Sequence, residues 1–293
     1  MPKFKKMKTI KQYGLEIQNL LPDFYDFNEK KSISEFFIKE ILNLSNTEYL
    51  LKKNDLLSKQ ELLKLENKKD RLLAGEPVQY VLNKAYFYGY EFFVDKRVLI
   101  PRQETEILID EIIKLYKSEE NLEILDIGCG SGNIAISLKK NLKDSQVSVI
   151  DISAGALDVC SKNATNHNVN LCFYQYDILS TEDKFFNEIS FDLIVSNPPY
   201  VRNSEKDLIL KNVTEFEPAN AIFVSDNEPL IYYQAIAGFA KTHLKPKGAL
   251  FFEINEAFGP HIVQICHNSG FTQVKIIQDL HNKDRFVFAR GLG

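Results

Sequence analysis

The feature that most constrains the fold is an alternation of short apolar segments with longer amphipathic ones, which runs from about residue 104 onward. The short segments are rich in Val, Ile, Leu and Phe, the composition typical of strands. Alternation of this kind predicts an α/β domain with a mostly parallel seven-stranded sheet and helices on both faces. The predicted strands are Glu123–Ile127, Val147–Asp151, Leu171–Tyr176, Phe191–Ser196, Ala249–Ile254, Val274–Ile277 and Phe286–Ala289. Predicted helices between them include Ala154–Asn166, Leu230–His243 and Phe258–Asn268.

The first third of the chain has a different pattern. It contains three Ser-x-x-Glu sequences, in which the serine hydroxyl and the glutamate carboxylate each satisfy a free backbone N–H at a helix start. These sequences begin at Ser32, Ser45 and Ser58, and leucines that recur between residues 50 and 65 supply an apolar face. We therefore expect short helices that form a separate domain, with either a purely structural role or a role in docking the substrate.

Residues 84–100 form a predicted connector between these two parts. Aromatic residues crowd the segment Tyr86–Val94, and Val98–Ile100 follows a polar Asp95-Lys96 pair. This pattern is typical of a β-hairpin with its turn at Asp95-Lys96, and its aromatic side chains are expected to form the hairpin core rather than to stack on bases. The predicted organisation is a helical domain at residues 1–82, a hairpin connector at 83–103 and the α/β domain at 104–293.

The composition excludes several protein classes. Hydrophobic residues make up 44% of the 293 residues and charged residues 26%, which is the balance of a folded, soluble protein. Apolar stretches are shorter than the roughly 18 residues that a membrane helix needs, and the basic start of the chain leads into no apolar core, so we expect neither a membrane span nor a signal peptide. The four cysteines form no C-x-x-C pair, which favours a reducing, cytoplasmic setting without a metal site.

The charge is unevenly distributed along the chain. The net charge is −4, but residues 1–80 carry +3 and the remaining residues carry −7. A protein that binds duplex nucleic acid usually presents a strongly basic face. The acidic balance of the larger part therefore disfavours nucleic acid as the main partner.

A glycine-rich turn follows the first predicted strand. The sequence from Asp126 to Gly132 reads D-I-G-C-G-S-G and leads directly into a predicted helix. Glycines in such a turn let the backbone approach a ligand closely. A dinucleotide fingerprint would need glycine where Asn133 stands, no Gly-Lys-Ser/Thr sequence of a Walker A loop follows, and a nucleophile elbow would need glycines in place of Cys129 and Asn133.

Acidic residues end the next two predicted strands. Asp151 is placed to accept hydrogen bonds from both hydroxyls of a ribose, the role that such a carboxylate has in nucleoside-binding sheets. Asp177, followed by Ile178, is placed to accept from an adenine amino group. A glycine turn and two strand-end acids imply an adenosine without a pyrophosphate, and the cationic S-adenosyl-L-methionine fits an acidic pocket. The alternative is that Asp126, Asp151 and Asp177 only cap helices or turns.

The fourth predicted strand runs into Asn197-Pro198-Pro199-Tyr200. The two prolines stiffen this turn and remove two backbone donors. A planar NH2 group can donate to the Asn197 side-chain oxygen and to the Pro198 carbonyl, with Tyr200 packed on its face. That arrangement selects an amide or an exocyclic amine and aims its nitrogen at the methyl group. Since an amide nitrogen is a poor nucleophile, catalysis should come mostly from alignment and electrostatics.

These motifs together resemble a known family, the peptide chain release factor glutamine methyltransferases (HemK-type), which are class I S-adenosylmethionine-dependent methyltransferases with a Rossmann-like domain. The N-P-P-Y sequence alone is shared with adenine and cytosine amino-methyltransferases of DNA, so the segments G-E-P-x-Q-Y and P-R-x-E-T-E narrow the choice. The resemblance covers about residues 70–293. The segments that carry it outside the pocket are Arg71–Tyr80, Val98–Glu106, Glu217–Ala219, Leu244–Gly248, Phe252–Ile254, Asp279–Leu280 and Asp284–Arg285.

The resemblance implies a cytoplasmic enzyme that methylates the glutamine side-chain nitrogen (N5) in the Gly-Gly-Gln motif of class 1 release factors in translation termination. It implies S-adenosyl-L-methionine as cofactor, S-adenosyl-L-homocysteine as product, no metal and no membrane partner, and we expect a monomer. The expected catalytic residues are Asn197, Pro198, Pro199 and Tyr200. The expected cofactor-binding residues are Gly128, Cys129, Gly130, Ser131, Gly132, Asp151, Asp177, Ile178 and Asn197.

Three departures from the family pattern concern loops, and three alternative functions stay open. Gln103 replaces a usual second proline, Asn255 replaces a usual glycine, and Val224–Glu228 contains less glycine than expected. The alternatives are an amino-methyltransferase acting on adenine or cytosine of nucleic acid, a ribosomal-protein glutamine methyltransferase, and a catalytically silent binding module that keeps the fold. The intact Asn197–Tyr200 sequence argues against the silent module.

Overall fold

The computed structural model describes residues 7–180 and 189–292, and the chain divides into two compact units. The first unit comprises Met1–Lys84 together with Ile209–Phe216. The second comprises Ala85–Leu208 and Glu217–Gly293. None of the helices in the described part of the chain combines the length and the apolar character that crossing a membrane requires.

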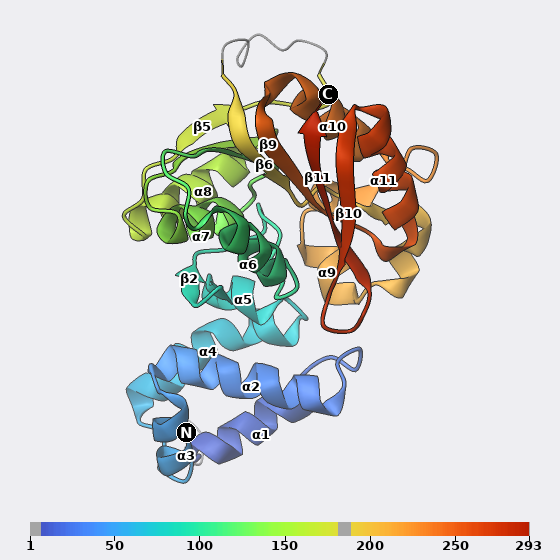
Figure 1. Ribbon diagram of the computed structural model, residues 1–293. Coiled ribbons are helices and arrows are strands. Elements are labelled where there is room, and N and C mark those ends of the chain that lie inside the picture. The colour runs from blue at the N-terminus through green and yellow to red at the C-terminus, as the bar shows by residue number, and fades with distance from the viewer. Residues whose placement is uncertain (1–6, 181–188, 293) are drawn as a thin grey trace. The chain divides into compact units, whose positions relative to one another are not determined.

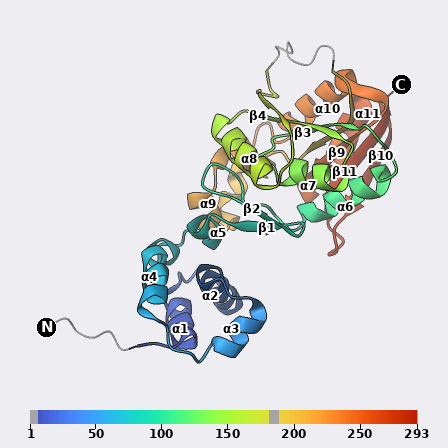
Figure 2. The same ribbon diagram turned by 90° about the vertical axis from the view of Figure 1, so that its left-hand side faces the viewer.

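The first unit is helical (Figure 2), and side-chain caps begin its longer helices. Ser45 and Ser58 form the predicted capping boxes at α3 and α4, each accepting from the backbone N–H of a glutamate three residues on. The prediction for Ser32 was wrong, because Asp26 and Glu29 form the capping box of α2 and the helix continues past Ser32. The helices of this unit are α1 (Ile10–Leu20), α2 (Phe27–Leu42), α3 (Asn46–Lys52), α4 (Lys59–Leu73), α5 (Val78–Leu82) and α9 (Lys211–Phe216).

The helical unit has its own apolar core. Tyr13 and Ile17 of α1 pack with Phe37 and Ile38 of α2, and all four side chains are fully buried. Leu65 of α4 completes the centre of this cluster. Because a buried apolar core is what makes a domain stable by itself, the first third is a folded unit rather than an extended arm.

The connector is a hairpin, but its turn lies earlier than the sequence predicted. Strands β1 (Ala85–Phe87) and β2 (Tyr90–Phe92) pair antiparallel, and the turn is at Tyr88-Gly89, both with positive φ. Two consecutive residues with positive φ make the turn whose twist matches paired strands. Val98–Ile100 is not a strand, because Asp95 accepts from the backbone and guanidinium of Arg97 and bends the chain there. The side chains of Phe87 and Phe92 are buried, as expected of a hairpin core.

The second unit is built on a sheet that has seven strands among the described residues, in the order β10-β11-β9-β6-β3-β4-β5. Strands β9, β6, β3, β4 and β5 run parallel, and β11 runs antiparallel between β9 and β10. The prediction of a mostly parallel seven-stranded sheet is therefore confirmed. Its strands are β3 (Glu123–Ile127), β4 (Gln146–Asp151), β5 (Cys172–Gln175), β6 (Phe191–Ser196), β9 (Leu244–Glu253), β10 (Phe271–Gln278) and β11 (Asp284–Leu292).

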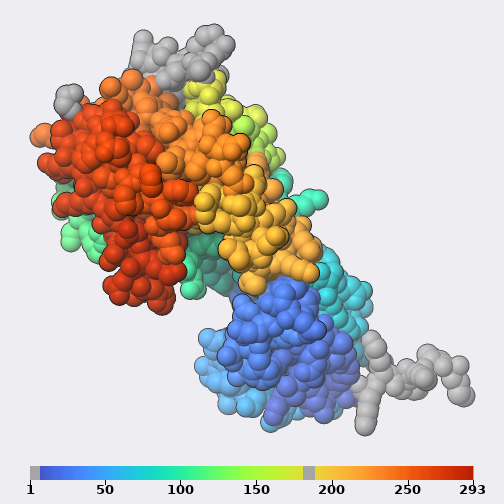
Figure 3. Space-filling model, turned by 90° about the vertical axis from the view of Figure 1, so that its right-hand side faces the viewer, coloured from blue at the N-terminus to red at the C-terminus, as the bar shows by residue number. Residues whose placement is uncertain are grey.

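Helices cover both faces of this sheet (Figure 1), because successive strand residues point to opposite sides. Ile124 and Val149 face the side of α6, α7 and α8, whereas Leu125 and Ile150 face the side of α10 and α11. Figure 3 shows α11 and the β10 edge of the sheet in orange and red. The helices are α6 (Thr105–Tyr116), α7 (Asn133–Asn141), α8 (Ala154–Asn166), α10 (Ile231–His243) and α11 (Gly259–Asn268).

Short elements follow β6 and complete the second unit. A two-stranded parallel pair and three 3-10 turns lie among the described residues of the segments between the main strands and helices. They are β7 (Val201–Arg202), β8 (Phe223–Val224), η1 (Asn203–Leu208), η2 (Ala219–Ala221) and η3 (Glu256–Phe258). The segment Val224–Glu228 begins at the last residue of β8.

The strand order decides where a ligand can bind. β6 lies between β3 and β9, and its last residue Ser196 pairs with Ile127 on one side and Phe252 on the other. The turns that follow β3 and β6 therefore leave the same edge of the sheet side by side. Parallel sheets bind ligands beyond the carboxyl ends of their strands, so the glycine turn and the Asn-Pro-Pro-Tyr turn flank one crevice.

Candidate active site

A pocket lies at this edge of the sheet, within the second unit. It is lined by the turns after β3, β4 and β6, by Ile178, by the connector residues that precede α6, and by α10. Ten of the predicted site residues line it: Gly128, Cys129, Gly130, Ser131, Asp151, Asp177, Ile178, Asn197, Pro198 and Pro199.

Two predicted site residues are near the pocket without being in its lining. Gly132 is the N-cap residue of α7. A Cβ added there would lie 2.5 Å from the Cys160 sulfur of α8, so the packing of the two helices requires glycine at this position. Tyr200 lies behind the turn and donates its hydroxyl hydrogen to the carboxylate of Glu253 at 3.2 Å. Burial and this carboxylate raise the pKa of Tyr200, so its hydroxyl stays a donor.

The glycine turn and Asp151 hold each other in place. The Asp151 carboxylate accepts from the backbone N–H of Gly130 at 3.0 Å and from that of Ser153 at 2.9 Å. The backbone N–H groups of Gly128 and Cys129 both donate to the carbonyl of Ile150 at the end of β4. Each carboxylate oxygen has a second lone pair, so Asp151 can still accept from a ligand in the pocket.

Asp126 is completely buried beneath the glycine turn. One of its oxygens accepts from the backbone N–H of Ala135 in α7 at 3.1 Å, and the other has no hydrogen-bond partner among the described residues. Burial raises the pKa of Asp126 to about 7. Asp126 therefore caps a helix, whereas Asp151 caps a turn and also lines the pocket.

The far end of the pocket is partly aromatic. Asp177 follows β5 and accepts from the backbone N–H of Leu179 at 2.9 Å. Ile178, Tyr176 and Tyr232 line the pocket beside it. Sequence reasoning missed both tyrosines, because an aromatic residue on a strand or a helix is more often part of a core.

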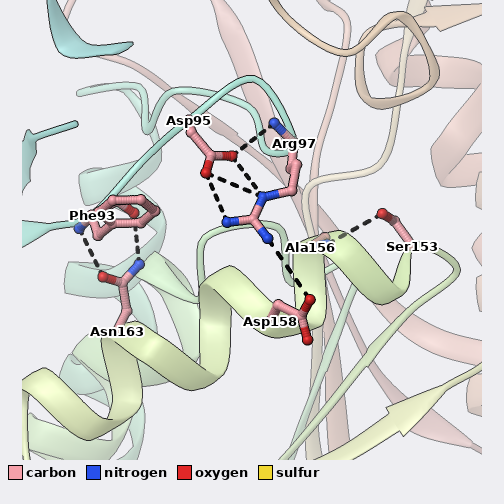
Figure 4. Close-up of polar contacts among 7 residues, drawn as sticks. All are labelled: Phe93, Asp95, Arg97, Ser153, Ala156, Asp158 and Asn163. Atoms are coloured by element: carbon pink, nitrogen blue, oxygen red, sulfur yellow. Dashed lines mark hydrogen bonds and ion pairs between the residues drawn. The ribbon is translucent and has the colours of Figure 1, made fainter. Parts of the chain in front are cut away.

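Helix α8 is hydrogen-bonded both to the connector and to the glycine turn. Figure 4 shows its contacts with the connector residues Phe93 and Arg97. The Asn163 side chain accepts from the backbone N–H of Phe93 at 2.7 Å and donates to the Phe93 carbonyl and to the Ser131 carbonyl, both at 2.9 Å. Arg97, which lines the pocket, donates to the Asp95 carboxylate from its backbone N–H and from its guanidinium, which also lies 3.7 Å from the Asp158 carboxylate. The connector residues before α6 and the glycine turn are thus hydrogen-bonded to the same helix.

The Asn-Pro-Pro-Tyr turn is fixed to its neighbours on both sides. Ser196 donates to the Ile127 carbonyl at 2.7 Å, which attaches the turn to β3. The Asn197 amide nitrogen donates to the Thr105 hydroxyl oxygen at 3.4 Å, and Thr105 lines the pocket. Asn255 donates to the Tyr200 carbonyl at 3.3 Å, so the residue that departs from the family pattern supports the turn.

Arg102 is a further pocket-lining residue that sequence reasoning left without a role. Its guanidinium donates to Glu217 at 2.7 Å, and Glu217 also accepts from the backbone N–H of Ile100 at 3.0 Å. The Glu217 side chain is 1% exposed, so this pair anchors the pocket wall. Both residues lie in segments that carry the resemblance to the family, which was the one signal that could have found them.

Comparison with known proteins places the chain in a family. Residues 103–216 match the family described as the methyltransferase small domain, and residues 19–82 match the PrmC N-terminal domain. A release factor glutamine methyltransferase of Flavobacterium psychrophilum is 40% identical over 281 residues, which cover 95% of this chain and 98% of the relative. This chain belongs to the release factor glutamine methyltransferases. A member of this family from Bacteroides thetaiotaomicron is 38% identical over 93% of this chain and 97% of its own.

The fold of this release factor glutamine methyltransferase family member also matches solved structures. A methyltransferase from Pyrococcus furiosus superposes with a TM-score of 0.51 and 18% identity, covering 78% of this chain and 99% of that one. The predicted class I methyltransferase fold is confirmed, and the chain is an enzyme of the methyltransferase class. In the described part of the chain, no group of three or more His, Cys, Asp or Glu residues is arranged to hold a metal ion.

Proposed function

We propose that this enzyme transfers a methyl group from S-adenosyl-L-methionine to the side-chain amide nitrogen of the glutamine in the Gly-Gly-Gln motif of class 1 release factors. The observation that carries the proposal is the pairing of the glycine turn with the Asn-Pro-Pro-Tyr turn across the β3–β6 pair. Relatives that match nearly the whole chain are named for the same reaction.

The pocket residues fit the cofactor. Gly128 and Gly130 have positive φ, and a Cβ added at either position would meet no atom within 4 Å, so the space beside the turn is open to a ligand. We infer that Asp151 accepts from the ribose hydroxyls, while Asp177 and Ile178 flank the adenine. Bound S-adenosyl-L-methionine would supply a methyl group on a positively charged sulfur, and an acidic pocket favours that charge.

The Asn-Pro-Pro-Tyr turn would hold the acceptor. The glutamine NH2 donates to the Asn197 oxygen and to the Pro198 carbonyl, which aims its lone pair at the methyl group. Bound S-adenosyl-L-methionine would give its methyl group from sulfur to this nitrogen and become S-adenosyl-L-homocysteine, and the nitrogen would lose a proton. The carboxylates in the pocket lining are Asp151 and Asp177, both on the cofactor side, so we expect the proton to leave to solvent. Alignment then supplies most of the rate.

One experiment tests both the activity and its main alternative. The protein is incubated with methyl-labelled S-adenosyl-L-methionine and either a release factor, a ribosomal protein extract or DNA, and the labelled atom is mapped by mass spectrometry. We expect the label on the glutamine of the Gly-Gly-Gln motif. Label on adenine, cytosine or a ribosomal-protein glutamine instead would overturn the proposal.

The helical domain is proposed to dock the folded release factor. It carries a net positive charge, and its α3 leucines Leu50 and Leu51 are 62% and 76% exposed. Replacing both by serine in the full chain should lower methylation of a whole release factor and leave methylation of a short Gly-Gly-Gln peptide unchanged. Equal loss on both substrates would contradict docking.

Two further points belong to the same proposal. All four cysteines are free thiols, which supports a cytoplasmic enzyme that works in a reducing compartment. We propose that the enzyme acts as a monomer, because one chain carries both halves of the pocket within its second unit.

A further inference from the structure

Glu253 lies directly behind the Asn-Pro-Pro-Tyr turn and is not in the pocket lining. It is the last residue of β9, and because Ser196 pairs with Phe252, Glu253 lies beside Asn197, the residue that follows β6. Its side chain is 1% exposed. Burial of a carboxylate costs free energy unless hydrogen-bond donors surround it, so the partners of Glu253 indicate its role.

The Glu253 side chain has two hydrogen-bond donors. Thr105, the first residue of α6, donates its hydroxyl hydrogen to one carboxylate oxygen at 2.5 Å. Tyr200 donates to the other at 3.2 Å. The Tyr233 hydroxyl, from α10, donates to the backbone carbonyl of Glu253 at 3.2 Å and fixes the main chain. Burial raises the pKa of Glu253, and the hydrogen bonds from Thr105 and Tyr200 and the positive charge of Arg285 oppose this shift.

The direction of these bonds determines the orientation of Asn197. A hydroxyl has one hydrogen, and Thr105 gives it to Glu253, so toward Asn197 the Thr105 oxygen can only accept. The Asn197 side chain must therefore turn its NH2 group to Thr105, as the 3.4 Å contact shows. Its carbonyl oxygen is then left to face the pocket as an acceptor.

We propose that Glu253 is a positioning residue that, through Thr105, fixes the Asn197 amide with its oxygen toward the pocket, and so makes the site select an NH2 group. Glu253 does not touch the substrate. When the carboxylate acceptor is lost, the Thr105 hydroxyl is free to donate to Asn197. The Asn197 amide can then rotate by 180°, so that its NH2 group faces the pocket and meets the NH2 group of the substrate. This inference rests on the proposed function of the turn. It extends that function to Glu253, which is 53 positions from Tyr200, and to Thr105, which is 92 positions from Asn197.

The test compares four variants of the full-length enzyme. Thr105→Val removes the hydroxyl at nearly constant volume, and Thr105→Ser restores it. Glu253→Gln keeps the size but has one acceptor oxygen in place of two, so it cannot replace both carboxylate oxygens that accept from Thr105 and Tyr200. Thr165→Val is the matched control, because Thr165 is exposed on α8 and its hydroxyl donates to the Ser161 carbonyl of its own helix.

The readouts are kcat and KM for a glutamine peptide, the Kd for S-adenosyl-L-methionine by calorimetry, and the unfolding midpoint. We expect kcat per cofactor-binding site to fall about 10- to 100-fold in Thr105→Val and Glu253→Gln, because a misaligned acceptor loses near-attack geometry. Cofactor Kd should stay within about threefold of wild type. Thr105→Ser should recover most of kcat, and Thr165→Val should match wild type.

Because kcat is calculated per cofactor-binding site, unfolded enzyme does not enter the value. A variant that only loses stability would therefore keep its kcat. The inference is overturned if Thr105→Ser is as slow as Thr105→Val, if Glu253→Gln keeps wild-type kcat, or if the loss appears only in cofactor Kd. The wild-type reaction tests the proposed function separately. If wild type methylates another NH2 substrate instead of glutamine, the same variants are compared on that substrate.

Discussion

The two halves of the pocket satisfy their polar groups in different ways. On the cofactor half, Asp151 binds backbone N–H groups of Gly130 and Ser153, at most 21 positions away in the chain. On the amide half, Glu253 binds the hydroxyls of Thr105 and Tyr200, and the first of these lies 148 positions away. The cofactor half is thus held by local backbone geometry, whereas the amide half depends on the register of β6, β9 and α6.

The two halves are therefore expected to be sensitive to different kinds of substitution. Backbone N–H groups cannot be removed by ordinary substitutions, so on the cofactor half we expect the main effects at the carboxylates themselves and at Gly132, where helix packing requires glycine. A network of side chains is sensitive at every member, because removing one partner leaves another buried group unpaired. We therefore expect variants of the amide half to affect turnover and variants of the cofactor half to affect binding.

The largest expected effect is on the amide half, at Asn197. Asn197→Ala removes the acceptor and lets the amide rotate away from the methyl group, so kcat should fall by about 100-fold or more. Asn197→Asp should be nearly as damaging, because it has no NH2 group for Thr105 and adds a second carboxylate near Glu253. Steady-state kinetics with a release factor measures this.

The control for Asn197 is Asn166→Ala, an exposed substitution at the end of α8. Cofactor Kd should change less in Asn197→Ala than in the Asp151 variant below. A variant at position 197 that keeps near-normal turnover would show that the turn does not position the acceptor.

The second largest effect is expected on the cofactor half, at Asp151. Asp151→Ala removes a charged acceptor from the ribose, so the binding free energy should weaken by about 1.5–3 kcal/mol, roughly 10- to 150-fold in Kd. Calorimetry with S-adenosyl-L-methionine measures the change, and Asp144→Ala, an exposed carboxylate in the same unit, is the control. Unchanged affinity would remove Asp151 from the binding site.

Asp126 provides a pH test beneath the cofactor half. Burial raises its pKa from an ordinary value near 4 to about 7, so the protonated form stabilises the fold below pH 4. This contribution is lost as pH rises through 7, on the order of a few kcal/mol. Asp126→Asn cannot titrate, so its unfolding free energy should change less between pH 5 and pH 8 than that of wild type.

Urea titrations at both pH values measure the Asp126 effect, with Asp144→Asn as the exposed control. At pH 5, where the protonated form of Asp126 predominates in wild type, Asp126→Asn should be less stable than wild type. At pH 8 the difference in unfolding free energy between the two should be smaller. A parallel pH dependence for variant and wild type would contradict the buried titration.

The smallest expected effect is at Asn255, which supports the amide half from outside the pocket. Asn255→Ala removes the hydrogen bond to the Tyr200 carbonyl and the cap that accepts from the Ala257 N–H. We expect about 1 kcal/mol of lost unfolding free energy and a change in kcat of less than about tenfold. Thermal unfolding and kinetics would reveal whether the loss is larger, which would make Asn255 part of the positioning network.

Much of the fold followed from local pattern. Glu123–Ile127, Phe191–Ser196 and Ala154–Asn166 match the observed β3, β6 and α8 to the residue. The hairpin turn was misplaced, because Asp95-Lys96 and Tyr88-Gly89 are both acceptable turn sequences and strand pairing chooses between them. The prediction of a capping box at Ser32 was wrong, because Asp26 and Glu29 form the box and α2 begins at Phe27. The predicted domain boundaries and site residues stay predictions.

The sequence by itself determined the class of sheet, the glycine turn, the strand-end acids and the stiff Asn-Pro-Pro-Tyr turn, because each depends on residues that are neighbours in the chain. The contacts of Glu253 with Thr105 and Tyr200, and of Thr105 with Asn197, became visible only in the folded protein. Hydrogen bonds between α6, β6 and β9 depend on strand order and register. Those are properties of the whole sheet, since buried polar groups find partners only after the strands have paired.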